Sequence, residues 1–399
     1  MALPCGCAAA DWRAEADRSI ERIRKGDAAV RVVNAAGQPV AGARVSADLV
    51  RHAFWFGTAL NAGMFRPEAD PDDAQRYKEI ARSHFNAAVH ENSLKWYHTQ
   101  RGGRDPDFSD ADRVLQWCQA NGLRMRGHCI FWGKYKYVPA WQKELDDPIL
   151  RRAVLERAQR VTSRYRGRIN EFDLNNEMLD PDFYADRLGK DITRAMARAA
   201  LDGNPAARLY VNDYAILAGH QDRPERYVAQ IKDLIARGVP VGGIGLQGHF
   251  IGNRPDPVKV RRALDLVAQF HLPIRITEYD CTEDPDGSAL DTVYRIAFAH
   301  PAVTGILMWG FWEGKHWKPK AALWERDWTP TPRAARYKAL VLDEWHTRAS
   351  GKTGADGDWH FRGFYGDYRL RAEGPGGQTA ETDAALSPGA PARFTLRLE

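Results

Sequence analysis

Between Arg51 and residue 346 the chain alternates between short apolar segments and longer amphipathic segments. The apolar segments have the β-branched and aromatic residues of buried strands, and the amphipathic ones have helical periodicity. The predicted strands are residues 53–60, 85–89, 123–131, 169–174, 208–212, 242–248, 273–278 and 303–309. The predicted helices are residues 73–83, 109–121, 148–165, 190–201, 222–237, 256–270, 287–299 and 331–346. Eight such units over about 290 residues predict an α/β fold, a (β/α)8 TIM barrel, whose usual size is about 250 residues and upward.

A different pattern flanks the barrel on both sides. The predicted domains are an N-terminal helical segment (1–27), a first β segment (28–51), the barrel (52–347) and a second β segment (348–399). The stretch VRVVNAAGQPVAGARVSADL in the first β segment indicates two strands around a Gly-Gln-Pro turn. It resembles the opening of a transthyretin-like or carboxypeptidase-regulatory-like β-sandwich. In the second β segment, DG, GD and GG turns separate short strands.

Neither β segment can bury an apolar face by itself, because two strands are marginally stable in water. We therefore expect both segments to form one accessory β-sandwich, with the barrel inserted between its halves. The apolar residues expected to meet are Val30, Val32, Val40 and Val45 from the first half and Phe361, Phe364, Tyr368, Leu370, Phe394 and Leu396 from the second. The alternative is two unrelated appendages that pack separately.

Carboxylates follow two of the predicted strands directly. The stretch FDLNNE ends in Glu177, and PIRITEYD carries Glu278 and Asp280. Barrel enzymes place their chemistry at the carboxyl ends of the strands, and glycoside hydrolysis needs two carboxyl groups. A single glutamate after a strand is most often a surface loop residue. Here, Asn176 before one glutamate and Tyr279 after the other favour a sugar-binding site.

Composition narrows the class of function. The net charge is +5, from 57 basic and 52 acidic residues, which is too balanced for a nucleic-acid-binding protein. The chain has 13 Trp, 14 Tyr and 15 Phe, and aromatic faces often pack on sugar rings. We expect no nucleic-acid partner, no membrane partner and a monomer.

The cysteines and the chain start carry less information. Cys5, Cys7, Cys118, Cys129 and Cys281 have no zinc-site spacing, and buried free thiols are expected for Cys129 and Cys281. No metal or organic cofactor is expected. No run of 18 apolar residues is present, and the first residues lack the charged and apolar regions of a signal peptide. We expect a secreted or extracytoplasmic protein whose signal peptide is absent from this sequence; a cytoplasmic protein is the alternative.

Six motifs in order on successive strands resemble family 10 glycoside hydrolases, the endo-β-1,4-xylanases. They are FNAAVHENSLKW, MRGHCIFW, FDLNNE, LYVNDY, GIGLQGHF and ITEYD, and the resemblance spans residues 52–346. It implies a retaining double-displacement mechanism, with Glu177 as acid/base and Glu278 as nucleophile. Xylan or xylo-oligosaccharides would be the substrate.

The resemblance also implies supporting roles. Glu91, Asn92 and Lys95 would grip sugars on the non-reducing side, and Asn176 would bind the 2-hydroxyl group beside the scissile bond. His249 would donate to Glu278, with Asp280 orienting it. The remaining expected site residues are His128, Trp132, Tyr214, Gln247, Trp309 and Trp317. His128 could instead be a core histidine, Trp309 a core tryptophan and Lys95 a solvated cation.

The chain departs from the family pattern after the eighth strand. The stretch there is GFWEGKHWKP, in which only Trp317 aligns, so the tolerance for decorated xylan is open. One alternative function is a retaining β-glycanase on the same barrel that acts on glucan or mannan. A second alternative is a carbohydrate-binding protein without catalysis.

Overall fold

The structure is a computed structural model that describes residues 7–103, 105–390 and 392–399. The chain divides into two compact units. One comprises Phe56–Ala297 and Ala302–Arg336, and the other comprises Met1–Trp55, Phe298–Pro301 and Tyr337–Glu399.

The strands of the first unit form a closed parallel ring. They are β3 (Trp55–Leu60), β4 (Ala87–His90), β5 (Arg124–Arg126), β6 (Phe131–Trp132), β7 (Glu171–Asn176), β8 (Arg208–Asp213), β9 (Gly243–Leu246), β10 (His249–Phe250), β11 (Ile274–Cys281) and β12 (Val303–Met308). The order is β5-β4-β3-β12-β11-β9-β8-β7-β6, and β10 pairs with β11. Gly127, directly after β5, pairs with Phe172 of β7 and closes the ring. The predicted (β/α)8 barrel is therefore confirmed.

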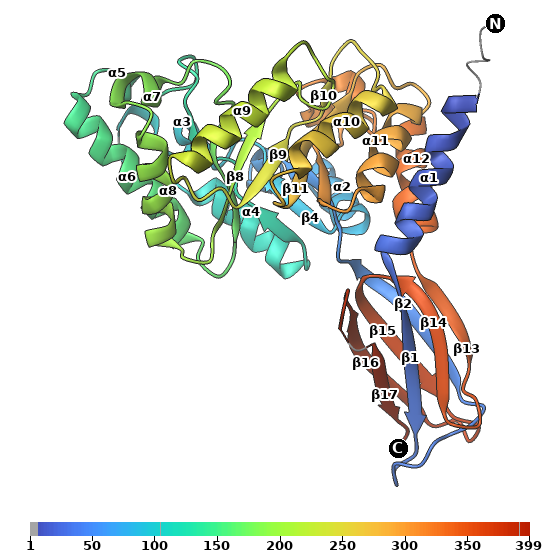
Figure 1. Cartoon of the computed structure of the whole chain (residues 1–399). Helices are drawn as coiled ribbons and strands as arrows, with labels where there is room; N and C mark the ends of the chain where they lie inside the picture. Colours follow the sequence, from blue (N-terminus) through green and yellow to red (C-terminus); the bar gives the residue numbers. More distant parts are fainter. Residues whose placement is uncertain (1–6, 104, 391) are drawn as a thin grey trace, which may run out of the picture. The chain divides into compact units, whose positions relative to one another are not determined.

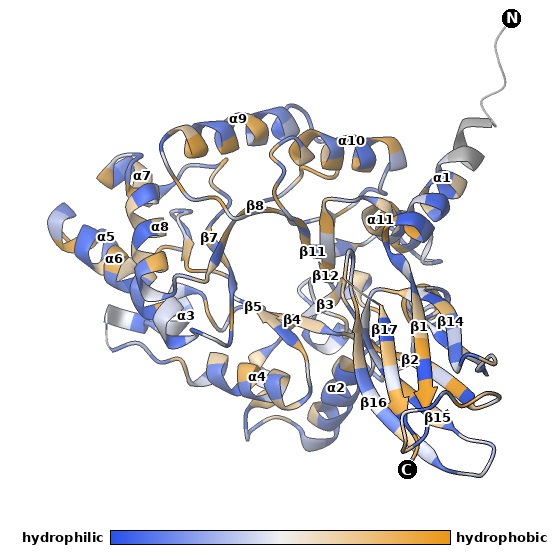
Figure 2. Cartoon of the chain, turned by 60° about the horizontal axis from the view of Figure 1, so that its bottom comes forward, coloured by the Kyte–Doolittle hydropathy of each residue, from blue (hydrophilic) through white to orange (hydrophobic). Residues whose placement is uncertain are grey.

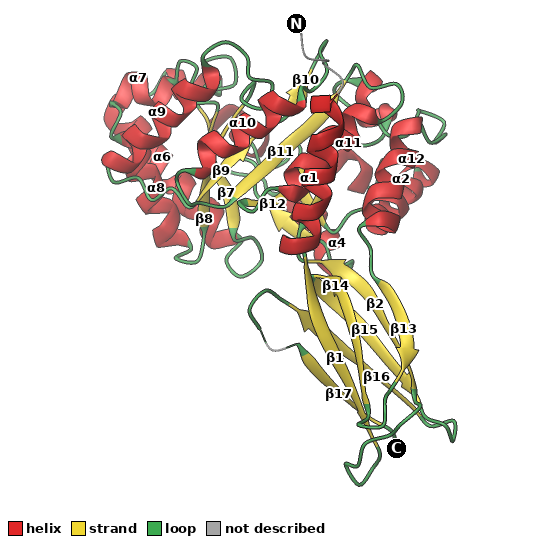
Figure 3. Cartoon of the chain, turned by 45° about the vertical axis from the view of Figure 1, so that its right-hand side comes forward, coloured by secondary structure: helices red, strands yellow, loops and turns green. Residues whose placement is uncertain are grey.

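Helices surround this ring (Figures 2 and 3). The longer ones are α2 (Pro71–His84), α4 (Ser109–Ala120), α6 (Asp147–Arg164), α8 (Ile192–Gly203), α9 (Arg223–Ala236), α10 (Pro257–Ala268) and α11 (Ser288–Ala299). Shorter ones are α3 (Trp96–Thr99), α5 (Ala140–Lys143), α7 (Phe183–Leu188) and α12 (Pro332–Lys338), which continues as a π-helical turn, Ala339–Glu344. Single 3-10 turns cover Ala62–Phe65, Arg101–Gly103, Glu313–Lys315 and Pro319–Ala321. Among the described residues, no helix has both the length and the apolarity to cross a membrane.

The second unit contains two sheets built from both ends of the chain (Figure 1). Their strands are β1 (Lys25–Val33), β2 (Arg44–His52), β13 (Arg348–Lys352), β14 (Asp358–Phe364), β15 (Gly366–Glu373), β16 (Thr379–Leu386) and β17 (Arg393–Arg397). One sheet has the order β14-β1-β17 and the other β13-β2-β15-β16. Each N-terminal strand thus lies between C-terminal strands, and the accessory β-sandwich from both termini is confirmed. Its likeness to transthyretin-like domains stays a prediction.

The sandwich core consists largely of the residues expected from the sequence. Val30, Val32, Val45, Leu370 and Leu396 are buried. The first strand begins earlier than its predicted start at residue 28, because Lys25 and Gly26 already pair with Phe364 and Gly363 of β14.

The N-terminal segment predicted as helical over residues 1–27 contains α1 (Cys7–Ile23). Residues 1–6, with Cys5, and the side chain of Cys7 lie outside the described part of the chain. Cys118, Cys129 and Cys281 are buried free thiols, as expected for the last two.

Candidate active site

The loops at the carboxyl ends of the barrel strands surround a cleft of about 690 Å³. Every predicted site residue except Asp280 lines it: Glu91, Asn92, Lys95, His128, Trp132, Asn176, Glu177, Tyr214, Gln247, His249, Glu278, Trp309 and Trp317. Asp280 lies behind His249 and accepts a hydrogen bond from Trp317. The cleft also contains residues that the sequence did not single out, among them Tyr97, Lys134 and Tyr137.

Glu278 lies on β11 with its carboxyl group buried among donors. Asn212 Nδ2 donates to Oε1 at 2.9 Å, and His249 Nε2 lies 3.3 Å from Oε2. Burial alone would raise the pKa of Glu278, but the nearby His128 and His249 rings and the Lys95 ammonium group lower it to about 2. The site therefore holds Glu278 as a carboxylate at ordinary pH.

His249 is kept protonated by its two carboxylate neighbours. Its Nδ1 lies 2.9 Å from Asp280 Oδ1. Burial disfavours the charged ring, but Asp280 and Glu278 raise the pKa of His249 to about 10. The ring can thus donate to both carboxylates, which is the contact pattern that the family resemblance implies.

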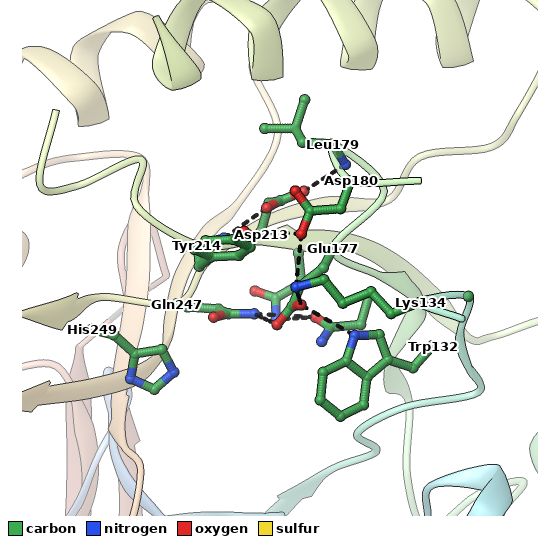
Figure 4. Close-up of polar contacts among 12 residues, drawn as sticks. Trp132, Lys134, Glu177, Leu179, Asp180, Asp213, Tyr214, Gln247 and His249 are labelled. Carbon is green, nitrogen blue, oxygen red and sulfur yellow. Dashed lines mark hydrogen bonds and ion pairs between the residues drawn. The ribbon is translucent and has the colours of Figure 1, made fainter. Parts of the chain in front are cut away.

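Glu177 directly follows β7 and has a left-handed backbone conformation, with φ of 61°. Such a conformation is strained for a residue other than glycine and is often found at functional sites. Gln247 Nε2 donates to its Oε1 at 2.9 Å, and Trp132 Nε1 donates to its Oε2 at 3.2 Å. Lys134 Nζ is 2.6 Å from the same Oε2 atom (Figure 4).

A short chain of amides connects the surroundings of the two glutamates. Asn176 Oδ1 accepts from Asn212 Nδ2 at 2.9 Å and from Gln247 Nε2 at 3.5 Å. Gln247 also donates to Glu177, and Asn212 also donates to Glu278. Asn212 lies in the LYVNDY motif but is not among the predicted site residues, because its role depends on contacts with Asn176 and Glu278 from other strands.

Glu91, Asn92 and Lys95 form a polar cluster after β4. Lys95 Nζ donates to Asn92 Oδ1 at 3.0 Å, and Asn61 Nδ2 donates to Glu91 Oε2 at 2.7 Å. Lys95 is buried and lies over the Trp132 ring at 4.7 Å, so it is not a solvated cation. Burial raises the pKa of Glu91, although its hydrogen bond from Asn61 and the charge of Lys95 counteract part of this effect.

His128 and Trp309 are both buried and also line the cleft. His128 Nδ1 bonds Asp173 Oδ2 at 2.8 Å, and Asp173 forms a bidentate ion pair with Arg126. Trp309 meets the His128 ring edge to face, with ring centroids 5.1 Å apart. His128 and Trp309 are therefore core residues and cleft residues at the same time. Trp317, in the divergent eighth loop, is 46% exposed.

Within the described ranges, no group of three or more His, Cys, Asp and Glu side chains is arranged to hold a metal ion. The independence of the chemistry from cofactors stays a prediction.

A barrel with two glutamates among polar and aromatic side chains in a cleft at its strand ends has the architecture of a glycoside hydrolase. Residues 46–341 match the model of Glycosyl hydrolase family 10, and the chain belongs to this family.

The curated relatives include a protein named as an anti-sigma factor and several named as xylanases. The chain is 37% identical over 369 residues to a protein of Acetivibrio thermocellus named anti-sigma-I factor RsgI6, which covers 92% of this chain and 47% of that protein. It is 36% identical over 358 residues to endo-1,4-beta-xylanase 1 of Arabidopsis thaliana, covering 88% of this chain and 37% of the relative. The chain thus spans less than half the length of these relatives. The crystal structure of xylanase 10B from Thermotoga petrophila RKU-1 in complex with xylobiose superposes with a TM-score of 0.67 at 25% identity, covering 73% of this chain and 95% of that one.

Proposed function

We propose that the chain is an endo-acting hydrolase that cleaves β-1,4-xylan with retention of the anomeric configuration. The observation that carries this proposal is the unequal surroundings of the two glutamates in one cleft. Glu278 is buried, has a donor on each carboxylate oxygen and has a lowered pKa. The carboxyl group of Glu177 instead contacts one amide, one indole and one ammonium group. A nucleophile and an acid/base need such a division.

In the first half-reaction, the carboxylate of Glu278 attacks the anomeric carbon. Glu177 gives its proton to the glycosidic oxygen, and that C–O bond breaks. The products are a glycosyl ester on Glu278 and the released saccharide, whose new 4-hydroxyl group carries the proton from Glu177. Asn176 stands between the two glutamates and would bind the 2-hydroxyl group of the reacting sugar.

In the second half-reaction, Glu177 takes a proton from water as the water oxygen attacks the same carbon. The ester bond to Glu278 breaks, the carboxylate returns, and Glu177 is protonated again. The two inversions give net retention.

The support for xylan as the substrate comes from the glycone side of the cleft and from the relatives. Glu91, Asn92 and Lys95 form a fixed set of donors and acceptors for sugar hydroxyl groups, and relatives and similar structures are named xylanases. A retaining β-glycanase for glucan or mannan is the alternative within the same chemistry. Release of reducing sugar, measured in parallel on xylan, β-glucan and mannan, distinguishes these substrates. We expect the highest kcat/KM on xylan. A preference for either other polymer overturns the substrate assignment.

A carbohydrate-binding role without catalysis is the second candidate, because one relative at 37% identity carries a name, anti-sigma-I factor, that is not an enzyme name. Binding of xylohexaose without any release of reducing sugar would favour this role. We further propose a monomer with xylan or xylo-oligosaccharides as its partners, and light scattering at increasing concentration measures the oligomeric state.

A further inference from the structure

Lys134 is the closest polar neighbour of the Glu177 carboxyl group. Its Nζ lies 2.6 Å from Oε2, compared with 2.9 Å for Gln247 and 3.2 Å for Trp132. A cation at this distance favours a carboxylate over a carboxylic acid. The proposed acid/base has to work in both forms, so a cation that served only the ionised form would hinder the first half-reaction.

Asp180 supplies the second partner that this chemistry requires. Lys134 Nζ lies 2.7 Å from Asp180 Oδ2, so the ammonium group bridges two carboxyl groups. Burial lowers the pKa of Lys134, but its bonds to Asp180 and Glu177 outweigh this effect and raise it above its ordinary value. Burial raises the pKa of Asp180, but the hydrogen bonds from Lys134 and Tyr214 outweigh this effect and lower it below its ordinary value. Both groups are therefore charged over the working pH range.

Asp180 is itself held from the neighbouring strand end (Figure 4). The Tyr214 hydroxyl group donates to its Oδ2 at 2.9 Å, and Arg223 reaches its Oδ1 at 3.3 Å. Arg223 also pairs with Asp213 at 2.8 Å. Lys134 lies over the Tyr214 ring at 4.7 Å. The position of Lys134 is thus fixed independently of Glu177.

We propose that Lys134 and Asp180 form a charge-compensated pair that positions the carboxyl group of Glu177 in both its protonated and its ionised form. The proposal rests on the proposed role of Glu177 as acid/base. When Glu177 carries its proton, Asp180 neutralises Lys134. When Glu177 is ionised, Lys134 offsets its charge. Lys134 and Asp180 act through Glu177 and are positioning residues.

Other titratable and charged groups face this cluster from each neighbouring element. They are Asp213 at the end of β8, Arg223 on α9, His249 on β10 and Glu278 on β11. Burial raises the pKa of Asp213 to about 6 in spite of its bonds to Leu179 and Arg223. The titration of Asp213 therefore falls on the acidic side of neutral, whereas the proposed mechanism assigns the alkaline limb of activity to the acid/base.

The test compares the alkaline limb of the kcat/KM profile for xylohexaose among three variants of the full chain. Lys134→Met leaves the charge of Asp180 beside Glu177, so we expect the limb to move to higher pH by about one unit or more. Asp180→Asn leaves Lys134 compensated by Glu177 alone, so we expect a shift of similar size to lower pH. The double variant should return close to the wild-type limb, because it removes both charges.

Matched variants separate charge from packing. Lys134→Arg keeps the positive charge and should therefore keep the alkaline limb at its wild-type pH. Lys136→Met should leave this limb unchanged, because Lys136 is exposed and lies over Tyr137. Opposite shifts cannot arise from a merely structural role, which would lower the amplitude without moving the limb. Shifts in the same direction, or none in folded variants with unchanged circular dichroism, overturn the proposal.

The outcome is distinct from that of the proposed function. If the wild-type chain releases no reducing sugar from xylan, the proposed function fails. If the wild-type chain cleaves xylohexaose with a bell-shaped pH profile but neither substitution moves the alkaline limb, only the proposed role of Lys134 and Asp180 fails.

Discussion

Buried Glu278 and half-buried His249 form a pair in which each group stabilises the charged form of the other. The carboxylate gains a donor at 3.3 Å, and the ring gains two anionic partners. The two groups would also have different roles in the reaction. Glu278 would form a bond to the anomeric carbon, and His249 would keep Glu278 ionised. Substitutions at the two positions should therefore be distinguishable by chemistry and by stability.

Replacement of Glu278, the proposed nucleophile, should greatly lower turnover. Glu278→Ala should lower kcat on xylan by about 10⁴-fold or more, because the group participates in both half-reactions. With an activated aryl β-xylobioside, added azide should restore turnover by attacking the anomeric carbon directly, and the product should be the α-glycosyl azide. Glu283→Ala is the matched control, since Glu283 is exposed and lies in the loop after β11. A β-glycosyl azide from Glu278→Ala would contradict the assignment.

His249 should make stability depend on pH in a definite direction. Its pKa in the folded protein, about 10, lies above its ordinary value of 6.5, so its contribution is fully present below pH 6.5 and is lost as the pH rises towards 10. The pKa of Glu278, about 2, lies below its ordinary value of 4.5, so its contribution is present above pH 4.5 and is lost as the pH falls towards 2.

The free energy of unfolding should show this window in urea titrations. His249→Asn should be less stable than the wild type by on the order of 3 kcal/mol at pH 5.5, and the difference should shrink by pH 9.5. His360→Asn, at an exposed position on β14, should show neither effect. A difference for His249→Asn that grows with pH would disprove the charged state of the ring.

At the scale of elements, the closure of the barrel depends on the contact between the end of β5 and β7. Gly127 N donates to Glu171 O at 2.9 Å, and Gly127 O accepts from Asp173 N at 3.0 Å. A Cβ atom at position 127 would come within 2.3 Å of the Phe172 ring. Only glycine therefore allows the two backbones to approach while Phe172 keeps its place.

Gly127→Ala should destabilise the protein by about 1–3 kcal/mol, because the overlap forces a shift of buried groups. Phe172→Leu should create room at the same point, so the double variant should be more stable than the sum of the two single effects predicts. Denaturant titration of the four proteins measures this coupling. Simple additivity would show that the alanine is accommodated without contact with residue 172.

The sequence predicted the elements of the barrel well because strands buried on both faces are nearly continuous apolar runs. It also predicted the residues that follow each strand, since these are local in the chain. It did not predict Lys134 or Asp180, because each sits in a polar loop where a charged residue is unremarkable. Their meaning comes from contacts between different strand ends, 2.6 to 2.9 Å apart.

At the scale of the whole molecule, the accessory sandwich belongs to one compact unit built from two distant parts of the chain. Val30 of β1 pairs with Trp359 of β14 and with Phe394 of β17, and Ala47 of β2 pairs with Ala349 of β13 and with Leu370 of β15. The sequence indicated this arrangement because each half had unmatched apolar strands. It could not give the pairing, since register depends on partners and not on composition.

Truncation after residue 347 should therefore expose the N-terminal strands. Removal of β13 to β17 leaves Val30, Val32 and Ala47, all buried in the full chain, without cover. Limited proteolysis should then cut within β1 or β2, whereas the full chain should resist at these positions. Leu370→Ala in the full chain should lower the stability of the sandwich by about 2–5 kcal/mol without cutting the chain. Equal protection of β1 and β2 with and without the C-terminal strands would refute the shared sandwich.

The split sandwich also sets an order for biosynthesis. β1 and β2 are translated before the barrel, and their partners in β13 to β17 are translated only after it. During that interval, both strands present open edges of the kind that pair with other chains. A nascent chain is therefore most exposed to misassembly before its last strands emerge, and a pause in translation within the barrel would lengthen that period.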